Sequence, residues 1–179
     1  MGCDRAVAIS SAGELDTLST SYYLSRALQK TGPYDIVFLA EGASDTYDGL
    51  VGPMLAEWLG VPFVGYAKKV EAGDTTMRAE VSLDDWAETD ETTLPAVVSV
   101  VSEVNTPRYP TLLQIMQASK KPMEDVTLDS LRDERLPQTA VTVTGLVVQS
   151  VTRKKVIFEG PAAETSQKLL DALRKEGLI

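Results

Sequence analysis

The stretch at residues 35–62, DIVFLAEGASDTYDGLVGPMLAEWLGVP, carries one strand, one loop and one helix of an α/β fold. Its first part contains an unbroken apolar run at residues 36–40, which is typical of a parallel strand covered on both faces. From residue 50 to residue 59, Val51, Leu55, Trp58 and Leu59 recur on one face of a helix. Gly60 ends that helix, and the next strand begins at Pro62.

The segments on either side extend the same pattern. Residues 5–10 predict an apolar strand, and residues 14–30 predict a helix that Gly32-Pro33 ends. Residues 94–101 predict a further apolar strand. The resulting order, in which strands and helices alternate over short connections, predicts a parallel sheet with right-handed crossovers.

The remaining elements are expected to be smaller. Residues 63–70 and 77–83 predict antiparallel strands around a turn at Gly73-Asp74. Residues 84–91 are expected to form an exposed turn that carries Trp86. Beyond a helical turn within 126–136 and a β-branched stretch at 139–149, residues 153–158 predict a strand and residues 161–177 a helix. We expect a main domain at 1–136 and a C-terminal strand and helix extension at 137–179.

Composition limits the chemistry. The chain has 179 residues, is 44% hydrophobic, contains one cysteine and no histidine, and lacks a stretch long enough to span a membrane. Zinc and copper sites and histidine-assisted nucleophiles are thereby disfavoured. A cytoplasmic protein that is not embedded in a membrane is the expectation.

Charge is uneven along the chain. The net charge of −9 argues against nucleic acid as a partner, because such binding depends on cations that neutralise phosphates. Residues 71–91 hold eight acids and one base, whereas residues 104–123 hold Arg108, Lys120 and Lys121 and no acid. This basic island either steers a partner or forms an ordinary solvated face.

The loop at residues 40–53, called the glycine loop below, is the candidate ligand site. Ligands of open α/β sheets bind beyond the carboxyl ends of the strands, and the N–H groups that begin the following helix favour an anion. Glu41, Asp45 and Asp48 oppose a phosphate unless they face a ribose hydroxyl or a cation. The predicted cofactor-binding residues are Gly42, Ala43, Ser44, Asp45, Thr46, Gly49, Val51 and Gly52.

Several segments resemble the β subunit of electron transfer flavoproteins. They are GCDRAV at 2–7, DIVFL at 35–39, VGPMLAE at 51–57, LPAVVS at 94–99, NTPRYPTLLQIMQASKK at 105–121 and KLLDALRKEGLI at 168–179. The chain is therefore identified as a divergent member of that family, either a shortened relative or a fragment. The resemblance implies a three-layer, parallel-sheet nucleotide-binding fold, similar to adenine nucleotide α-hydrolases, without the usual N-terminal strands and helices.

The resemblance also implies a function. Members pair with an α subunit, collect electrons from dehydrogenases such as the acyl-CoA dehydrogenases of fatty acid oxidation, and pass them to a respiratory acceptor. The redox FAD lies mainly on the α subunit, and the β subunit holds AMP or a second FAD. No side chain of this chain is expected to act as a catalytic acid, base or nucleophile.

Residues 105–121, called the docking segment below, resemble the family loop that anchors the dehydrogenase. Leu112 takes the apolar anchor position and is expected to be partly exposed, whereas Ile115 and Met116 are expected to pack into the core. Gln117 and Ser119 stand where the family has basic residues. The predicted docking residues are Asn105, Pro107, Arg108, Tyr109, Leu112, Ile115, Met116, Lys120 and Lys121.

The glycine loop departs further from the family pattern. Glu41 replaces a basic residue, and only Ala43, Asp45, Val51 and Gly52 fit. Apolar faces at 6–9 and 36–39 are expected to need a partner, either a second copy or an α-type subunit. The competing function is that of a nucleotide-binding-fold homologue that assembles with partners but holds neither flavin nor nucleotide.

Overall fold

The computed structural model describes residues 2–83, 86–137, 141, 143–145, 147–148, 150 and 152–179. It divides into two compact units, Met1–Thr142 and Val143–Ile179. Within the stretch expected at 139–149, residues 139, 140, 142, 146 and 149 lie outside the described residues.

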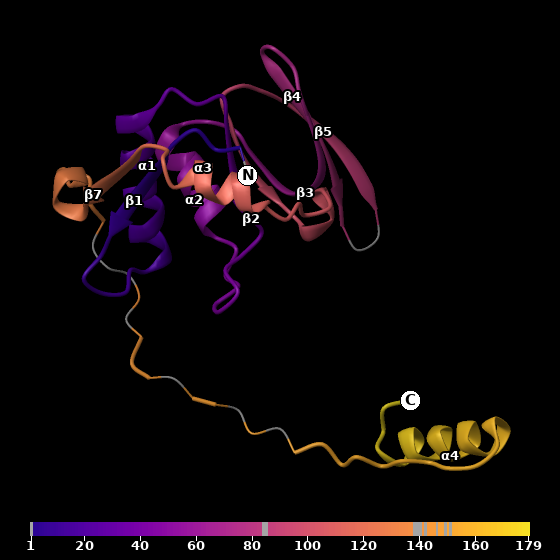
Figure 1. Ribbon diagram of the computed structural model, residues 1–179. Helices are drawn as coiled ribbons and strands as arrows, with labels where there is room; N and C mark the ends of the chain where they lie inside the picture. The colour runs from indigo at the N-terminus through magenta and orange to yellow at the C-terminus, as the bar shows by residue number, and fades with distance from the viewer. Residues whose placement is uncertain are drawn as a thin grey trace. The chain divides into compact units, whose positions relative to one another are not determined.

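The elements follow one another as labelled in Figure 1. The strands are β1 (Ala6–Ser10), β2 (Ile36–Ala40), β3 (Phe63–Ala72), β4 (Thr76–Ser82), β5 (Ala87–Thr93), β6 (Ala96–Val100) and β7 (Met123–Thr127). The helices are α1 (Thr17–Thr31), α2 (Val51–Leu59), α3 (Leu112–Ala118) and α4 (Ala162–Lys175), with 3-10 turns η1 (Ser102–Val104) and η2 (Leu128–Leu131).

The expected α/β fold is confirmed, with a mixed rather than a wholly parallel main sheet. Its strand order is β2-β6-β3-β4-β5, in which β2, β6 and β3 are parallel and the β3–β4 and β4–β5 pairs are antiparallel. The first predicted strand, β1, lies in a separate parallel pair with β7. Within the described residues, β1 therefore pairs along one edge only, and so does β2.

Local sequence explains where the helices begin and end. The carboxylate of Asp16 accepts the Ser19 N–H at 2.8 Å and caps α1, which ends before Gly32. Gly60 takes a φ of +68° and closes α2, as the Gly-Val-Pro sequence predicts. Helices α1 and α2 lie side by side, and α2 packs on the main sheet through Leu55, Ala56 and Val97.

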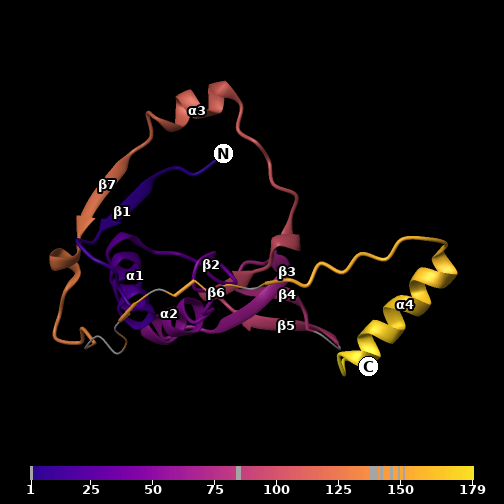
Figure 2. The same ribbon diagram turned by 90° about the horizontal axis from the view of Figure 1, so that it is seen from below.

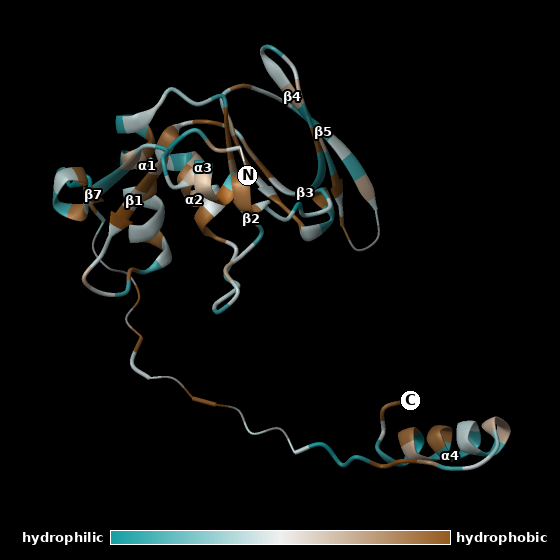
Figure 3. Cartoon of the chain, viewed as in Figure 1, coloured by the Kyte–Doolittle hydropathy of each residue, from teal (hydrophilic) through white to brown (hydrophobic). Residues whose placement is uncertain are grey.

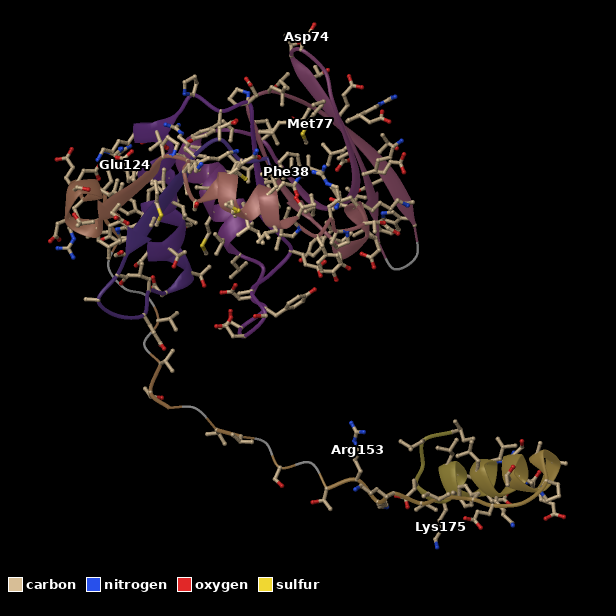
Figure 4. The ribbon with its side chains drawn as sticks, viewed as in Figure 1. Phe38, Asp74, Met77, Glu124, Arg153 and Lys175 are labelled. Carbon is tan, nitrogen blue, oxygen red and sulfur yellow. The ribbon has the colours of Figure 1, made fainter. Side chains whose placement is uncertain are left out.

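The main sheet is covered differently on its two faces. On the side away from α2, Ala96 and Val98 of β6 pack against Met77, Ala79 and Val81 of β4. Figure 4 places Met77 inside the curve of the β3–β4 hairpin and Asp74 at its tip. The expectation that residues 36–40 are covered on both faces is wrong, since Phe38 is 55% exposed at the edge strand β2.

A polar clamp fastens the segment after η2 to α1. The hydroxyl of Tyr22, a buried residue, donates to Asp133 at 2.7 Å and accepts the Asp133 N–H at 3.0 Å. Arg26 and Arg135 pair with the same carboxylate, at 3.2 and 3.0 Å. Hydrogen bonds from Tyr22 and Arg135 hold the pKa of Asp133 well below its usual range.

Two further expectations about strands are wrong. Residues 87–93 form strand β5 rather than a turn, because their backbone pairs along the whole of β4 despite their acidic side chains. Trp86 is exposed, as expected. Residues 153–158 form no strand, because the described residues of the second unit offer no strand for them to pair with. The final helix is confirmed as α4.

The second unit is an amphipathic helix with an extended arm. Lys154 of the arm pairs with Glu176 beyond the end of α4, at 2.5 Å. Figure 3 shows apolar and polar residues on different sides of α4, and none of its residues is buried. Leu169 and Leu170 are 48% and 40% exposed. The helix therefore displays an apolar surface that this unit does not cover by itself.

Candidate functional site

The docking segment follows β6 and η1 and leads into β7. Residues 105–111 are extended, and α3 then begins at a capping box in which Gln114 donates its N–H to Thr111 Oγ1 at 3.3 Å and accepts the Thr111 N–H at 2.9 Å. Figure 2 shows α3 standing apart from α1, α2 and the main sheet, between the long connection that follows η1 and strand β7. The cap thus gives a short helix a fixed start without support from the core.

The apolar side chains of α3 face solvent. Leu112 is 75% exposed, in agreement with the expectation that it is accessible. Ile115 and Met116 are 54% and 56% exposed, so the expectation that they pack into the core is wrong. The physical reason is position: α3 lies outside both hydrophobic clusters that α1 and α2 build.

The polar part of the docking segment is equally accessible. Asn105, Pro107, Arg108, Tyr109 and Lys120 are all exposed, with Tyr109 at 93%. Lys121 donates a hydrogen bond to the carbonyl oxygen of Cys3, which ties the end of the segment to the chain before β1. All the predicted docking residues therefore lie on one accessible segment.

The glycine loop lies beyond the carboxyl end of β2, where the sequence predicted it. Ala43, Ser44, Asp45 and Thr46 are exposed, and Gly42, Gly49 and Val51 are partly exposed. Asp45 accepts the Thr46 N–H at 2.8 Å, and Asp48 accepts a hydrogen bond from the Thr17 hydroxyl at the start of α1. The predicted cofactor residues are thus on one continuous surface, except Gly52, which is buried.

The loop glycines have structural roles. A Cβ on Gly52 would stand 2.8 Å from the ring of Phe63, so this position is small because α2 packs closely on β3. Gly49 has a φ of +65°, a conformation that side chains disfavour. A Cβ on Gly42 would stand 3.0 Å from the ring of Tyr47. Packing and backbone conformation therefore account for all three without a phosphate.

The loop suits the ring and hydroxyl groups of a nucleotide better than its phosphates. No side chain caps the N-terminus of α2, which leaves that helix end open to an anion. Glu41, Asp45 and Asp48 give the loop three negative charges, however, and residues 40–53 contain no lysine or arginine. Carboxylates accept hydrogen bonds from ribose hydroxyls and ring N–H groups.

Two tyrosines that the sequence did not single out belong to this surface. Tyr47 and Tyr66 take φ values of +50° and +57°, and both side chains are exposed. A hydrogen bond with Glu41 raises the pKa of Tyr47 above its usual value. The sequence does carry one signal, since a glycine inside a strand pattern, here Gly65, often marks a bulge.

These features define an α/β protein with a glycine-containing loop beyond the edge strand β2 and an exposed apolar docking segment. The family model of the electron transfer flavoprotein domain matches residues 1–131. Together with the curated relatives described next, this match shows that the chain belongs to the β-subunit family of electron transfer flavoproteins.

The relatives are each named electron transfer flavoprotein subunit beta. Those of Bacillus subtilis and Thermoanaerobacterium thermosaccharolyticum are 33% identical over 183 and 187 residues. The one from Clostridium acetobutylicum is 30% identical over 185 residues. Each alignment covers 100% of this chain and 71% of the relative.

Other kinds of site are not found in the described residues. These residues contain no helix that is both long and apolar enough to cross a lipid bilayer. In the same ranges, no cluster of three or more cysteine and acidic side chains is arranged to hold a metal ion.

Proposed function

We propose that this chain is the β-type subunit of an electron transfer flavoprotein, which holds a nucleotide and docks a dehydrogenase. Electrons then pass from the dehydrogenase flavin to a respiratory acceptor. The observation that carries the proposal is the exposed α3, whose apolar side chains lie on a segment that the chain fixes at both ends.

The docking segment has the properties of a binding surface. Pro107 and Pro110 restrict its backbone, and the capping box holds the first turn of α3. One face of α3 carries three exposed apolar side chains at i, i+3 and i+4 spacing, those of Leu112, Ile115 and Met116. An exposed apolar patch of this kind is typical of a surface that a partner covers. Arg108, Lys120 and Lys121 add positive charge that suits an acidic partner.

The apolar anchor is Leu112, and an acyl-CoA dehydrogenase is the partner class we propose for it. Members of this dehydrogenase class act in fatty acid oxidation, and a cytoplasmic location of the complex is part of the proposal. The flavin, once bound, supplies the electron transfer, and the residues of this chain supply positioning and contact.

An α-type subunit is the second proposed partner. The relatives carry the name subunit beta, and the redox FAD of the complex is proposed to lie mainly on the α subunit. Two surfaces of this chain suit such a partner, namely the uncovered apolar side of α4 and the unpaired edges of β1 and β2 in the described part of the chain. In isolation, the same edges favour a homodimer.

The experiment is co-expression with an α-type subunit, followed by purification and a visible spectrum. Flavin bands, with AMP or FAD released on denaturation, support the proposal. A colourless complex without nucleotide, or no complex at all, contradicts the proposal.

One observation favours a second candidate function. The carboxylates of Glu41, Asp45 and Asp48 and the lack of a cation in the glycine loop suit a homologue that assembles with partners but holds no nucleotide. The same purification separates the two, since that homologue forms a complex that is colourless and free of nucleotide.

A further inference from the structure

The main sheet is interrupted where Tyr66 lies. Strand β3 pairs with β6 through Val64–Val98 and Ala67–Val100, so that Gly65 and Tyr66 together oppose the single residue Ser99. This is a β-bulge, a device that turns a side chain away from its regular direction. The Tyr66 N–H, which has lost its regular ladder position, donates instead to Ser99 Oγ at 3.1 Å.

The backbone of both tyrosines is held in a conformation that disfavours a side chain. Tyr47, Tyr66 and Lys155 are the non-glycine residues with positive φ in the described ranges. Two of these three are tyrosines beside the same loop, and their side chains are 63% and 45% exposed. Strained residues that remain exposed gain little from packing, which makes them candidates for contact with a ligand.

Contacts with the glycine loop bring the two rings onto one surface. The ring of Tyr47 covers Gly42, and the Tyr66 hydroxyl lies over Gly49, where an added Cβ would stand 3.5 Å from it. The same Cβ would stand 3.2 Å from the carbonyl oxygen of Glu41. Both glycines therefore lie under tyrosine side chains. Glu41 adjoins both glycines, since it precedes Gly42 in the chain and its carbonyl oxygen lies beside Gly49.

We propose that Tyr47 and Tyr66 form a stacking surface for a planar nitrogen heteroaromatic ring, the adenine or isoalloxazine of a nucleotide. The inference rests on the proposed function, in which this loop holds a nucleotide, and it assigns ring recognition to Tyr47 and Tyr66. Aromatic side chains stack on any such ring, and the Glu41 carboxylate accepts hydrogen bonds from its N–H groups.

The charge of the loop agrees with recognition through the ring. No lysine or arginine within residues 40–53 is available for a phosphate, and Glu41, Asp45 and Asp48 repel one. A nucleoside without phosphate is therefore expected to bind at least as tightly as the corresponding nucleotide. A site that recognises the phosphate binds the nucleotide more tightly than the nucleoside.

The test uses the full chain and riboflavin, whose fluorescence is quenched when its ring stacks on tyrosine. We expect saturable quenching by the wild-type chain, and recovery of the fluorescence when adenosine displaces riboflavin identifies adenine as a ligand too. Tyr66→Gly and Tyr47→Gly remove the rings and relieve the backbone, and each is expected to weaken binding roughly tenfold. Tyr66→Phe keeps the ring and is expected to bind almost as the wild type does, as is Tyr109→Ala in the docking segment.

Stability separates a binding role from a structural one. Glycine adopts positive φ without a side-chain penalty, so Tyr66→Gly is expected to leave the midpoint of urea denaturation close to that of the wild type. A large fall in that midpoint identifies Tyr66 as a packing residue and overturns the proposal. Absence of quenching by the wild type overturns it as well, and so does quenching by both glycine variants that equals that of the wild type.

Different results overturn the stacking surface and the proposed function. A yellow α–β complex that keeps its nucleotide when this chain carries both glycine substitutions leaves the function standing and overturns the stacking surface. Riboflavin quenching by the isolated chain, combined with a colourless complex, supports the surface and overturns the function.

Discussion

Leu112→Ala is expected to weaken dehydrogenase docking while leaving the fold almost unchanged. Leu112 is 75% exposed, so folding hides only about a quarter of the side chain. Full burial of a leucine is worth about 1.5–3 kcal/mol, so the expected loss of folding free energy is about 0.5 kcal/mol. Truncation of the buried Leu55 is expected to cost about 2–5 kcal/mol instead.

The effect on docking is larger, because the bound dehydrogenase is proposed to cover the three quarters of the Leu112 side chain that folding leaves exposed. Burial of that part is worth about 1–2 kcal/mol, so its removal is expected to lower the affinity for the dehydrogenase roughly 5- to 30-fold. Ile115→Ala and Met116→Ala, whose side chains are about half exposed, are expected to act in the same direction with smaller effects.

The assay pairs urea denaturation of each variant with the rate at which an acyl-CoA dehydrogenase reduces the α–β complex at increasing concentrations of that complex. Leu83→Ala, which truncates a 39% exposed leucine outside the docking segment, is the control for a leucine that no dehydrogenase is proposed to cover. If Leu112→Ala unfolds the chain, Leu112 is a core residue. If all three α3 variants reduce at the wild-type rate, the docking segment has another role.

Three further outcomes test the structure. Tyr22→Phe removes the buried hydroxyl that bonds to Asp133 and is expected to lower the free energy of unfolding by about 1–2 kcal/mol in urea. Because the folded-state pKa of Asp133 is depressed, its stabilisation is full above the unfolded pKa and is lost as pH falls toward the folded value. Asp133→Asn should therefore flatten the acid side of the stability–pH curve, and an unchanged slope would contradict the clamp. Gly52→Ala, which brings a Cβ to 2.8 Å from Phe63, should cost about 1–3 kcal/mol, whereas Gly13→Ala, with open space around it, should cost almost nothing.

Much of the fold followed from local patterns. The apolar runs that became β2 and β6, the Asp16 cap of α1 and the Gly60 end of α2 are short-range signals, because the residues that form these features lie close together in the sequence. The β3–β4 hairpin around Gly73-Asp74 is of the same kind. The family itself was predicted from short segments spread along the chain, of which the docking segment is the most specific.

Other features depend on partners far away in the chain. Strand β5 was missed because its acidic residues form a strand only by pairing with β4. Strand β1 was expected in the same parallel sheet as β2 and instead pairs with β7, more than a hundred residues later. Register between such distant strands is set by long-range contacts, which local periodicity does not contain.

The sequence by itself determined the family, the α/β class, the position of the glycine loop at the end of β2 and the accessible Leu112. Only the tertiary structure decided that Ile115 and Met116 are exposed, because an apolar helical stripe is the same in sequence whether a core or a partner covers it. It also decided that Tyr47 and Tyr66 stand on one surface with left-handed backbones. Tyr66 lies in a bulge opposite Ser99 and its hydroxyl approaches Gly49, and both contacts join segments that are apart in the sequence.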